Sequence, residues 1–288
     1  MSNADIYQSV TVRILESLDK GVVPWRKPWA VQAPSNLASK HVYRGINQIL
    51  LSCSAFDSPF WLTLKQANDL GGRIKRGERG TPIVFWKVVE RPNPKDKEDD
   101  RFFLLKRFTV FNVEQTEGIA IPKVEPRTFD PIVECEAVVA SYNEPPSILQ
   151  MGSQACYLPA LDRIWIPKPE QFTSPAEYYS TLFHELAHST GAAHRLARPG
   201  VTDPSRFASH TYSFEELVAE CGAAFLCAHA GISSQVIDNS AAYIQSWARK
   251  LRSEPRWIVD AASKASRAAD LILGKLPMTN AEPSQAAA

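Results

Sequence analysis

The chain has 288 residues, which is long enough for two modest domains. Its formal net charge is +1 at pH 7, and 44% of its residues are hydrophobic. No apolar run approaches the roughly 20 residues of a membrane span, so we expect no membrane contact. Five cysteines without C-x-x-C spacing exclude a disulfide framework, and residues 1–5 open no signal peptide, so we expect a cytoplasmic protein.

The small net charge hides a difference between the two halves of the chain. Residues 1–125 hold 19 Lys and Arg against 14 Asp and Glu, whereas residues 126–288 hold 13 against 17. A basic front half and an acidic back half hint that the front half contacts nucleic acid.

The first expected element is an amphipathic helix over residues 5–19, because its apolar residues recur at helical spacing, and Gly21 ends it. A proline-braced segment follows at residues 24–29, where two indoles surround two cations. Such a segment is either a rigid packing turn or a surface that stacks on bases.

Residues 71–80 form a glycine-spaced loop with four cations, followed by a strand at 82–87. Glycine lets backbone amides approach phosphate oxygens, and the cations add charge without demanding a base sequence. A solvated hairpin tip is the alternative. Aromatic residues interleaved with cations are typical of single-stranded DNA binding. The predicted DNA contacts are Trp25, Arg26, Lys27, Trp29, Tyr43, Arg44, Arg73, Lys75, Arg76, Arg79, Trp86 and Lys87.

The rest of the chain reads as alternating strands and helices. In chain order we expect a charged loop at 93–100, a strand at 101–111, a linker between 115 and 131, a helix at 132–142, a hairpin of strands 155–158 and 163–167, helices at 213–230, 234–252 and 255–274, and an Ala-rich tail. An edge of the hairpin is one candidate for holding an extended peptide by backbone pairing.

Residues 184–188 spell H-E-x-x-H, the zinc-hydrolase signature. On a helix, His184 and His188 lie one turn apart and can bind a single ion. Glu185 lies off that axis and suits a general base that takes a proton from the attacking water. Ser174 and Glu177 form a capping box that starts the helix.

The third metal ligand has two candidates. His194 completes the metzincin pattern H-E-x-x-H-x-x-G-x-x-H, but no methionine lies between it and Met278 to form the expected Met-turn. Glu216 lies in the predicted helix 213–230, with Glu220 one turn later, and Glu220 could orient a ligating histidine as in gluzincins. We favour Glu216. Tyr212 and His210 are candidates for stabilising the oxyanion, on sequence proximity alone.

Several segments together resemble the plasmid-borne ArdC antirestriction family and the front region of TraC-type conjugative primases, over nearly the whole chain to about residue 274. They are residues 43–47, 71–87, 110–118, 183–188 and 215–220. The resemblance implies a single-stranded DNA-binding domain, a metallopeptidase-like domain with His, His and Glu ligands, and protection of conjugative DNA from host restriction. His194 departs from the family pattern, which weakens the metzincin alternative.

We therefore predict an α+β protein with a single-stranded DNA-binding domain at 1–125, a zincin-like metallopeptidase domain at 130–275 and a disordered tail at 276–288. Zinc is held by His184, His188 and Glu216, Glu185 is the base and Glu220 orients; manganese and cobalt are alternative ions. Three functions remain open: a protease that cleaves a host restriction subunit or another DNA-bound protein, a strand-coating protein with a structural metal, and a peptidase unrelated to DNA.

Overall fold

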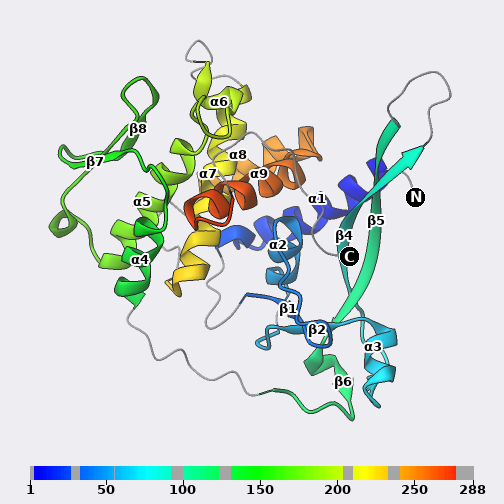
Figure 1. The fold of residues 1–288 in the computed structure, drawn as a ribbon. Helices are drawn as coiled ribbons and strands as arrows, with labels where there is room; N and C mark the ends of the chain where they lie inside the picture. The colour runs from blue at the N-terminus through cyan, green and yellow to red at the C-terminus, as the bar shows by residue number, and fades with distance from the viewer. Residues whose placement is uncertain are drawn as a thin grey trace. The chain divides into compact units, whose positions relative to one another are not determined.

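The computed structural model describes residues 3–26, 33–54, 56–91, 100–122, 131–203, 210–232 and 241–276 (Figure 1). The chain forms two compact units. Unit 1 comprises Met1–Pro24, Ala33–Glu125 and Ala241–Val259, and unit 2 comprises Trp25–Gln32, Pro126–Ser240 and Asp260–Ala288. The predicted α+β class is confirmed by helices and sheets in both units. None of the described helices is long and apolar enough to cross a membrane.

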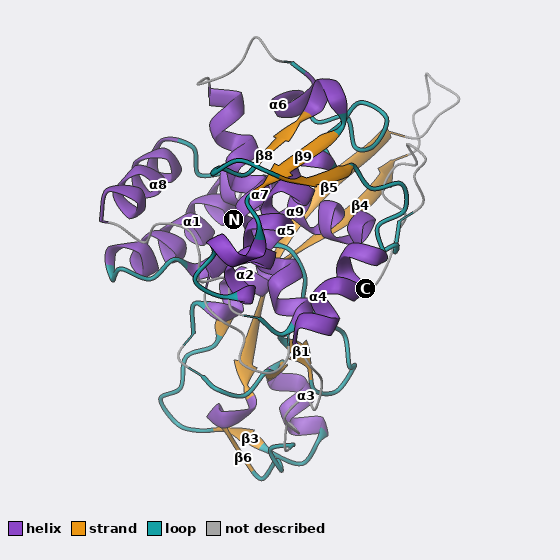
Figure 2. Ribbon diagram, turned by 90° about the vertical axis from the view of Figure 1, so that its left-hand side faces the viewer, coloured by secondary structure: helices purple, strands orange, loops and turns teal. Residues whose placement is uncertain are grey.

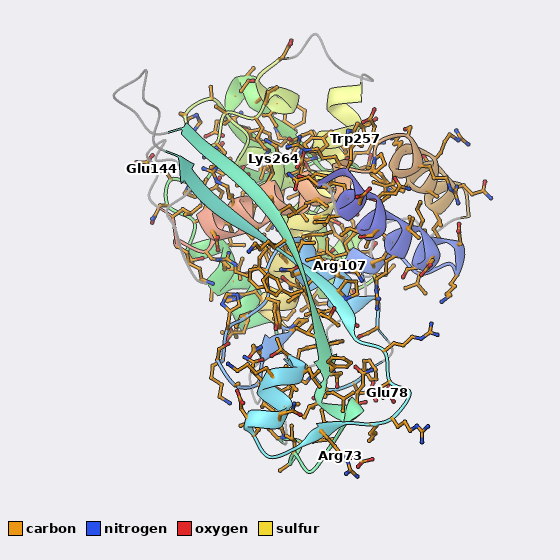
Figure 3. The ribbon with its side chains drawn as sticks, turned by 90° about the vertical axis from the view of Figure 1, so that its right-hand side faces the viewer. Arg73, Glu78, Arg107, Glu144, Trp257 and Lys264 are labelled. Carbon is orange, nitrogen blue, oxygen red and sulfur yellow. The ribbon has the colours of Figure 1, made fainter. Side chains whose placement is uncertain are left out.

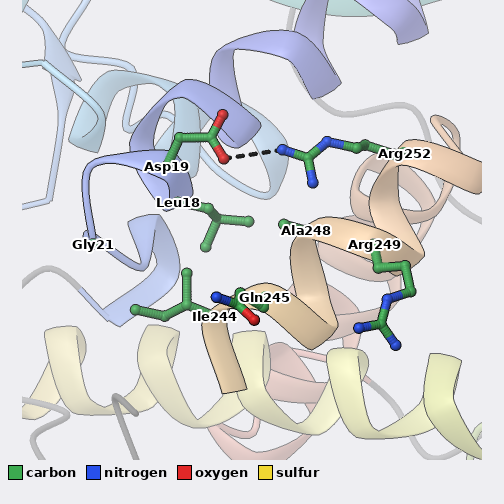
Figure 4. Close-up of a pocket in the computed structure, with 8 residues that line it drawn as sticks. All are labelled: Leu18, Asp19, Gly21, Ile244, Gln245, Ala248, Arg249 and Arg252. Atoms are coloured by element: carbon green, nitrogen blue, oxygen red, sulfur yellow. Dashed lines mark hydrogen bonds and ion pairs between the residues drawn. The ribbon is translucent and has the colours of Figure 1, made fainter. Parts of the chain in front are cut away.

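Unit 1 brings together the first helix and a helix from near the end of the chain. Helix α1 (Asn3–Asp19) forms from the predicted apolar stripe and buries Ile6, Val10, Ile14 and Leu18. Helix α8 (Ala241–Ser253) packs on α1, and Arg252 pairs with Asp19 at 3.0 Å (Figure 4). The predicted domain of residues 130–275 includes α8, whereas in the structure α8 belongs to unit 1.

The main sheet of unit 1 has four strands in the order β1 (Ser35–Asn36), β2 (Phe60–Leu62), β5 (Asp100–Asn112) and β4 (Thr81–Arg91). Strands β4 and β5 pair antiparallel over their length, as their alternating residues predict. Helix α2 (Ile46–Ser52) packs on β4, and the Asn47 side chain donates to Val84 O and accepts from Val84 N at 2.7 and 2.8 Å. The Asn47 amide thereby satisfies two buried backbone groups of β4.

Shorter elements complete unit 1. Helix α3 (Leu64–Asp69) starts at a capping box of Thr63 and Gln66, and the 3-10 helix η1 (Pro24–Arg26) lies where the chain passes from unit 1 to unit 2. The two-residue strands β3 (Arg73–Ile74) and β6 (Thr116–Glu117) pair antiparallel, and the 3-10 helix η2 (Val113–Gln115) precedes β6. The linker therefore begins later than the predicted residue 115, because β6 still belongs to the fold of unit 1.

Unit 2 places a small sheet beside a helical layer. Strands β7 (Ser147–Gln150), β9 (Arg163–Ile166) and β8 (Cys156–Leu158) lie in that order, and β8 and β9 form the predicted hairpin (Figure 2). The 3-10 helix η3 (Pro159–Leu161) joins β8 to β9, and η4 (Pro169–Gln171) follows β9. The helices are α4 (Pro131–Ala140), α5 (Pro175–Ser189), α6 (Pro199–Thr202), α7 (His210–Ala230) and α9 (Trp257–Ile272).

Helices α5 and α7 approach each other closely. A Cβ added at Gly222 of α7 would lie 3.0 Å from Ala187 Cβ of α5, so glycine permits this approach. Both helices are largely apolar where they meet, with Phe183, Leu186, Leu217 and Val218 buried. This packing fixes the side chains of α5 and α7 relative to one another.

Candidate metal centre

The H-E-x-x-H motif lies in the second half of α5, whose start is set by its cap. Ser174 Oγ accepts from Glu177 N at 3.2 Å, as the sequence predicts. The Glu177 carboxylate accepts from Thr173 N at 2.7 Å instead of reaching the Ser174 amide, so the predicted reciprocal bond is displaced by one residue. Helix α5 then runs without interruption through His184 and His188.

The structure brings together three potential metal ligands, His184 and His188 of α5 and Glu216 of α7. The two Nε2 atoms lie 3.1 Å apart, and each lies 3.5 Å from one oxygen of the Glu216 carboxylate. A tetrahedral ion with bonds of about 2.0–2.1 Å needs neighbouring ligand atoms about 3.3 Å apart. The three residues therefore fit a divalent ion with a fourth position open.

Glu215, for which we predicted no role, contacts the His188 ring at Nδ1. His188 Nδ1 lies 3.4 Å from Glu215 Oε1, and Arg198 donates to both Glu215 oxygens at 2.9 and 2.7 Å. Arg198 also donates to Thr190 Oγ1 and Ala187 O. Burial would raise the pKa of Glu215, but Arg198 and His188 outweigh it and lower this pKa. Glu215 thus remains a carboxylate. It fixes the His188 ring with Nε2 facing His184 and Glu216.

Glu220 is buried on α7, one turn beyond Glu216, as predicted from the sequence. His184 Nδ1 is also buried but has no hydrogen-bond partner among the described residues, so the structure does not show Glu220 bonded to it. Burial lowers the pKa of His184, but the bond to Glu216 and the charges of Glu185 and Glu220 raise it to about 9. These carboxylates also favour a divalent cation, which competes with that proton.

His194 lies apart from the three grouped ligands. Its side chain is 52% exposed, and its Nε2 lies 3.6 Å from Asp162 Oδ2. Asp162 also accepts from Arg195 and from Tyr157 Oη at 2.8 Å. The structure therefore brings Glu216, and not His194, to the two histidines.

Gly191 has a steric role, because a Cβ there would lie 2.5 Å from Val201 Cγ2 and 3.0 Å from Arg198 Nη2.

A cavity of about 710 Å³ opens onto His184, Glu185 and His188. Strand β8 lines one side of it, and β8 is an edge strand of its sheet within the described residues. Cys156 of β8 and Glu185 both line this cavity. Burial and, to a smaller extent, the Glu185 charge raise the pKa of Cys156. The side chains of His210 and Tyr212 lie outside the described set, so their predicted role stays a prediction.

The structure changes the predicted DNA-binding set in the front half of the chain. Tyr43 is 2% exposed and its hydroxyl accepts from Asn36 Nδ2 at 3.2 Å, and Trp25 is fully buried. Burial removes both rings from the predicted stacking residues, because a base needs an accessible ring face. Lys27 and Trp29, and the side chains of Arg26, Trp86 and Lys87, lie outside the described residues.

The basic loop and Arg44 are exposed. Arg73, labelled in Figure 3, pairs with Glu117 at 2.6 Å. Lys75 Nζ donates to Glu114 O at 2.8 Å. Arg76 and Arg79 make no side-chain ion pair with the described carboxylates. Lys75, Arg76 and Arg79 are therefore the loop cations whose charge no described acid neutralises.

Comparison with known proteins matches the front and the back of the chain to two different family models. Residues 134–264 match the model of a zincin-like metallopeptidase, and residues 4–111 match the N-terminal domain of anti-restriction factor ArdC. The class of protein is thus one in which an ArdC-type N-terminal domain precedes a zincin-like metallopeptidase domain.

Solved structures and sequence relatives also match nearly the whole chain. The ArdC protein of plasmid R388 in its metal-free form is 38% identical, with a TM-score of 0.76 over 94% of this chain and 97% of that one. Its Mn(II)-bound form has a TM-score of 0.75. The y4eC protein of Sinorhizobium fredii is 36% identical over 92% of this chain and 91% of its own. A TraC DNA primase of Escherichia coli is 33% identical over 93% of this chain, which spans 27% of that primase.

The chain belongs to the ArdC antirestriction family, which confirms the resemblance drawn from the sequence.

Proposed function

We propose that this protein protects plasmid DNA entering by conjugation, by binding the single strand with unit 1 and hydrolysing a peptide bond with unit 2. The observation that carries the hydrolytic part is the convergence of His184, His188 and Glu216 within metal-ligand distance beside an open cavity. Its substrate is a host restriction subunit or another DNA-bound protein. The family membership supports the antirestriction role.

The resident ion in this proposal is a divalent metal, most simply zinc, because imidazole and carboxylate ligands in a four-coordinate arrangement suit it. Manganese and cobalt remain alternatives, since the same ligands accept them, and the R388 relative has a Mn(II)-bound structure. When bound, the metal polarises a carbonyl and makes water more acidic.

The chain's own residues supply the remaining steps. His184, His188 and Glu216 hold the ion, and Glu215 fixes His188 through Nδ1. Glu185 accepts the proton of the attacking water and passes it to the leaving amine. The free edge of β8 offers backbone groups that pair with an extended peptide beside Glu185.

The test compares plasmid transfer into a restricting host for two variants. We expect Glu185→Gln to abolish protection and cleavage while leaving affinity for single-stranded DNA unchanged, because Glu185 lies in unit 2. Glu170→Gln, an exposed glutamate of the same unit, serves as the charge-matched control. Full protection by Glu185→Gln would contradict the proteolytic mechanism.

A second candidate function is supported by the exposed loop cations. In this alternative the protein coats the entering strand and the metal is structural. Changing Lys75, Arg76 and Arg79 together to Ala would then remove protection, while Glu185→Gln would keep it. A peptidase unrelated to DNA would show no salt-sensitive retention of the wild-type protein on single strands.

A further inference from the structure

Strand β5 carries an exposed aromatic ring. Phe108 is 46% exposed, and it is the only Phe, Trp or Tyr classed as exposed in the part of the chain that the structure describes. Trp25 and Tyr43, two of the four rings predicted to contact DNA, are buried instead. The most exposed of the described rings of unit 1 thus lies on β5.

The neighbours of Phe108 on its own face of the sheet are a second ring and a cation. Residues opposite each other in an antiparallel pair share a face, and so do residues two apart along a strand. Ile83 opposes Phe108, and Phe85 opposes the exposed Lys106. The rings of Phe85 and Phe108 meet edge to face, with centroids 5.4 Å apart. Phe85 therefore supports Phe108 from the core side.

A second cation approaches the same face from α1. Arg13 donates to Thr81 Oγ1 at 3.4 Å, and Thr81 opposes Val110, which lies two residues from Phe108. Neither Arg13 nor Lys106 forms an ion pair with a carboxylate among the described residues. Phe108 thus lies between two positive charges that no described acid neutralises.

Exposure of one apolar side chain is ordinary and carries no function alone. A ring with unpaired cations on both sides is more specific, because it matches a chain of bases joined by phosphates. In a duplex the bases cover each other, so only a single strand offers free base faces. A protein partner would instead need a broader apolar area around the ring.

We propose that Phe108, supported by Phe85 and flanked by Lys106 and Arg13, is a stacking platform for the bases of single-stranded nucleic acid. The inference rests on the proposed DNA-binding function of unit 1 and assigns the residue on which a base stacks. The cations contact the adjacent phosphates.

The experiment measures affinity of the full-length protein for oligo(dT) and for an abasic strand of equal length, each over a range of salt concentrations. Phe108→Leu keeps an apolar side chain but removes the ring face, so we expect affinity for oligo(dT) to fall about 5- to 150-fold. Affinity for the abasic strand and the salt dependence should not change. Phe108→Trp should retain binding to oligo(dT).

Two controls separate stacking from charge and from general surface change. Lys106→Gln should reduce the slope of log affinity against log salt by about 0.7 on both strands, as expected for one lost phosphate contact. Leu64→Ala, at another exposed apolar position of unit 1, should have no effect. Circular dichroism and the melting temperature confirm that each variant is folded.

Wild-type affinity of Phe108→Leu for oligo(dT) would overturn the inference, and so would an equal loss on both strands. Loss of binding to a host protein, with oligo(dT) affinity retained, would assign the ring to a protein interface and also overturn it. Absence of salt-sensitive oligo(dT) binding by the wild-type protein would instead refute the DNA-binding function itself.

Discussion

Glu215 shows how one side chain can orient a potential metal ligand, His188. Glu215 contacts His188 Nδ1, and Arg198 donates to both Glu215 oxygens. Glu215 and Arg198 are almost fully buried. A buried ion pair is sensitive to the loss of one partner, because the other charge is then uncompensated. The orientation of His188 therefore depends on a carboxylate and a guanidinium that do not touch the metal position.

We predict that Glu215→Gln lowers metal affinity about 10- to 100-fold, the usual effect of changing a carboxylate that orients a ligating histidine. Metal affinity is measured by competition with a chromogenic chelator. Glu170→Gln, an exposed position of the same unit outside α5 and α7, should bind metal like the wild type. Unchanged affinity in Glu215→Gln would show that His188 needs no such support.

At the scale of elements, the local sequence predicted the start of α5 and the placement of its two histidines one turn apart. Caps and helical spacing act within a few residues, so no distant contact was needed for either. The choice of Glu216 over His194 required the packing of α5 on α7, which sequence spacing does not specify. Glu215 was missed because its partner Arg198 comes from a separate segment. Composition likewise could not show that Tyr43 and Trp25 face the core, since aromatic residues serve both surface and interior.

Metal should tie α5 to α7, because its ligands come from both helices. At a free metal concentration 100 times Kd, binding should stabilise unit 2 by about 2.7 kcal/mol. We predict that chelation lowers the melting temperature of the wild-type protein, and that Glu216→Gln greatly weakens this response. The same chelator-induced shift in both proteins would exclude Glu216 as a ligand.

At the scale of the whole molecule, unit 1 is discontinuous in sequence. Thr11 Oγ1 donates to Pro255 O across 244 residues, and α8 packs on α1. The sequence did not reveal this, because the apolar stripe of α8 specifies a buried face without specifying what covers it. The family model of the zincin-like domain matches residues 134–264, so it also includes α8, although α8 packs on α1.

A fragment of residues 1–125 lacks the helix that covers α1. We predict that it melts at a lower temperature than unit 1 of the full chain and binds apolar dyes, because the α1 surface facing α8 becomes exposed. Adding residues 241–259 as a separate peptide should raise its melting temperature. A fragment as stable as the intact unit would show that α8 contributes nothing to unit 1.

The packing of α8 on α1 also has a consequence during synthesis. At 5–20 residues per second, a ribosome needs roughly ten seconds to pass from residue 125 to residue 259. Throughout that interval the nascent front segment lacks its last helix, so its exposed apolar face is available to chaperones. A polypeptide that ends after α7 would therefore lack the helix that covers α1, so the folding of unit 1 depends on the synthesis of residues 241–259.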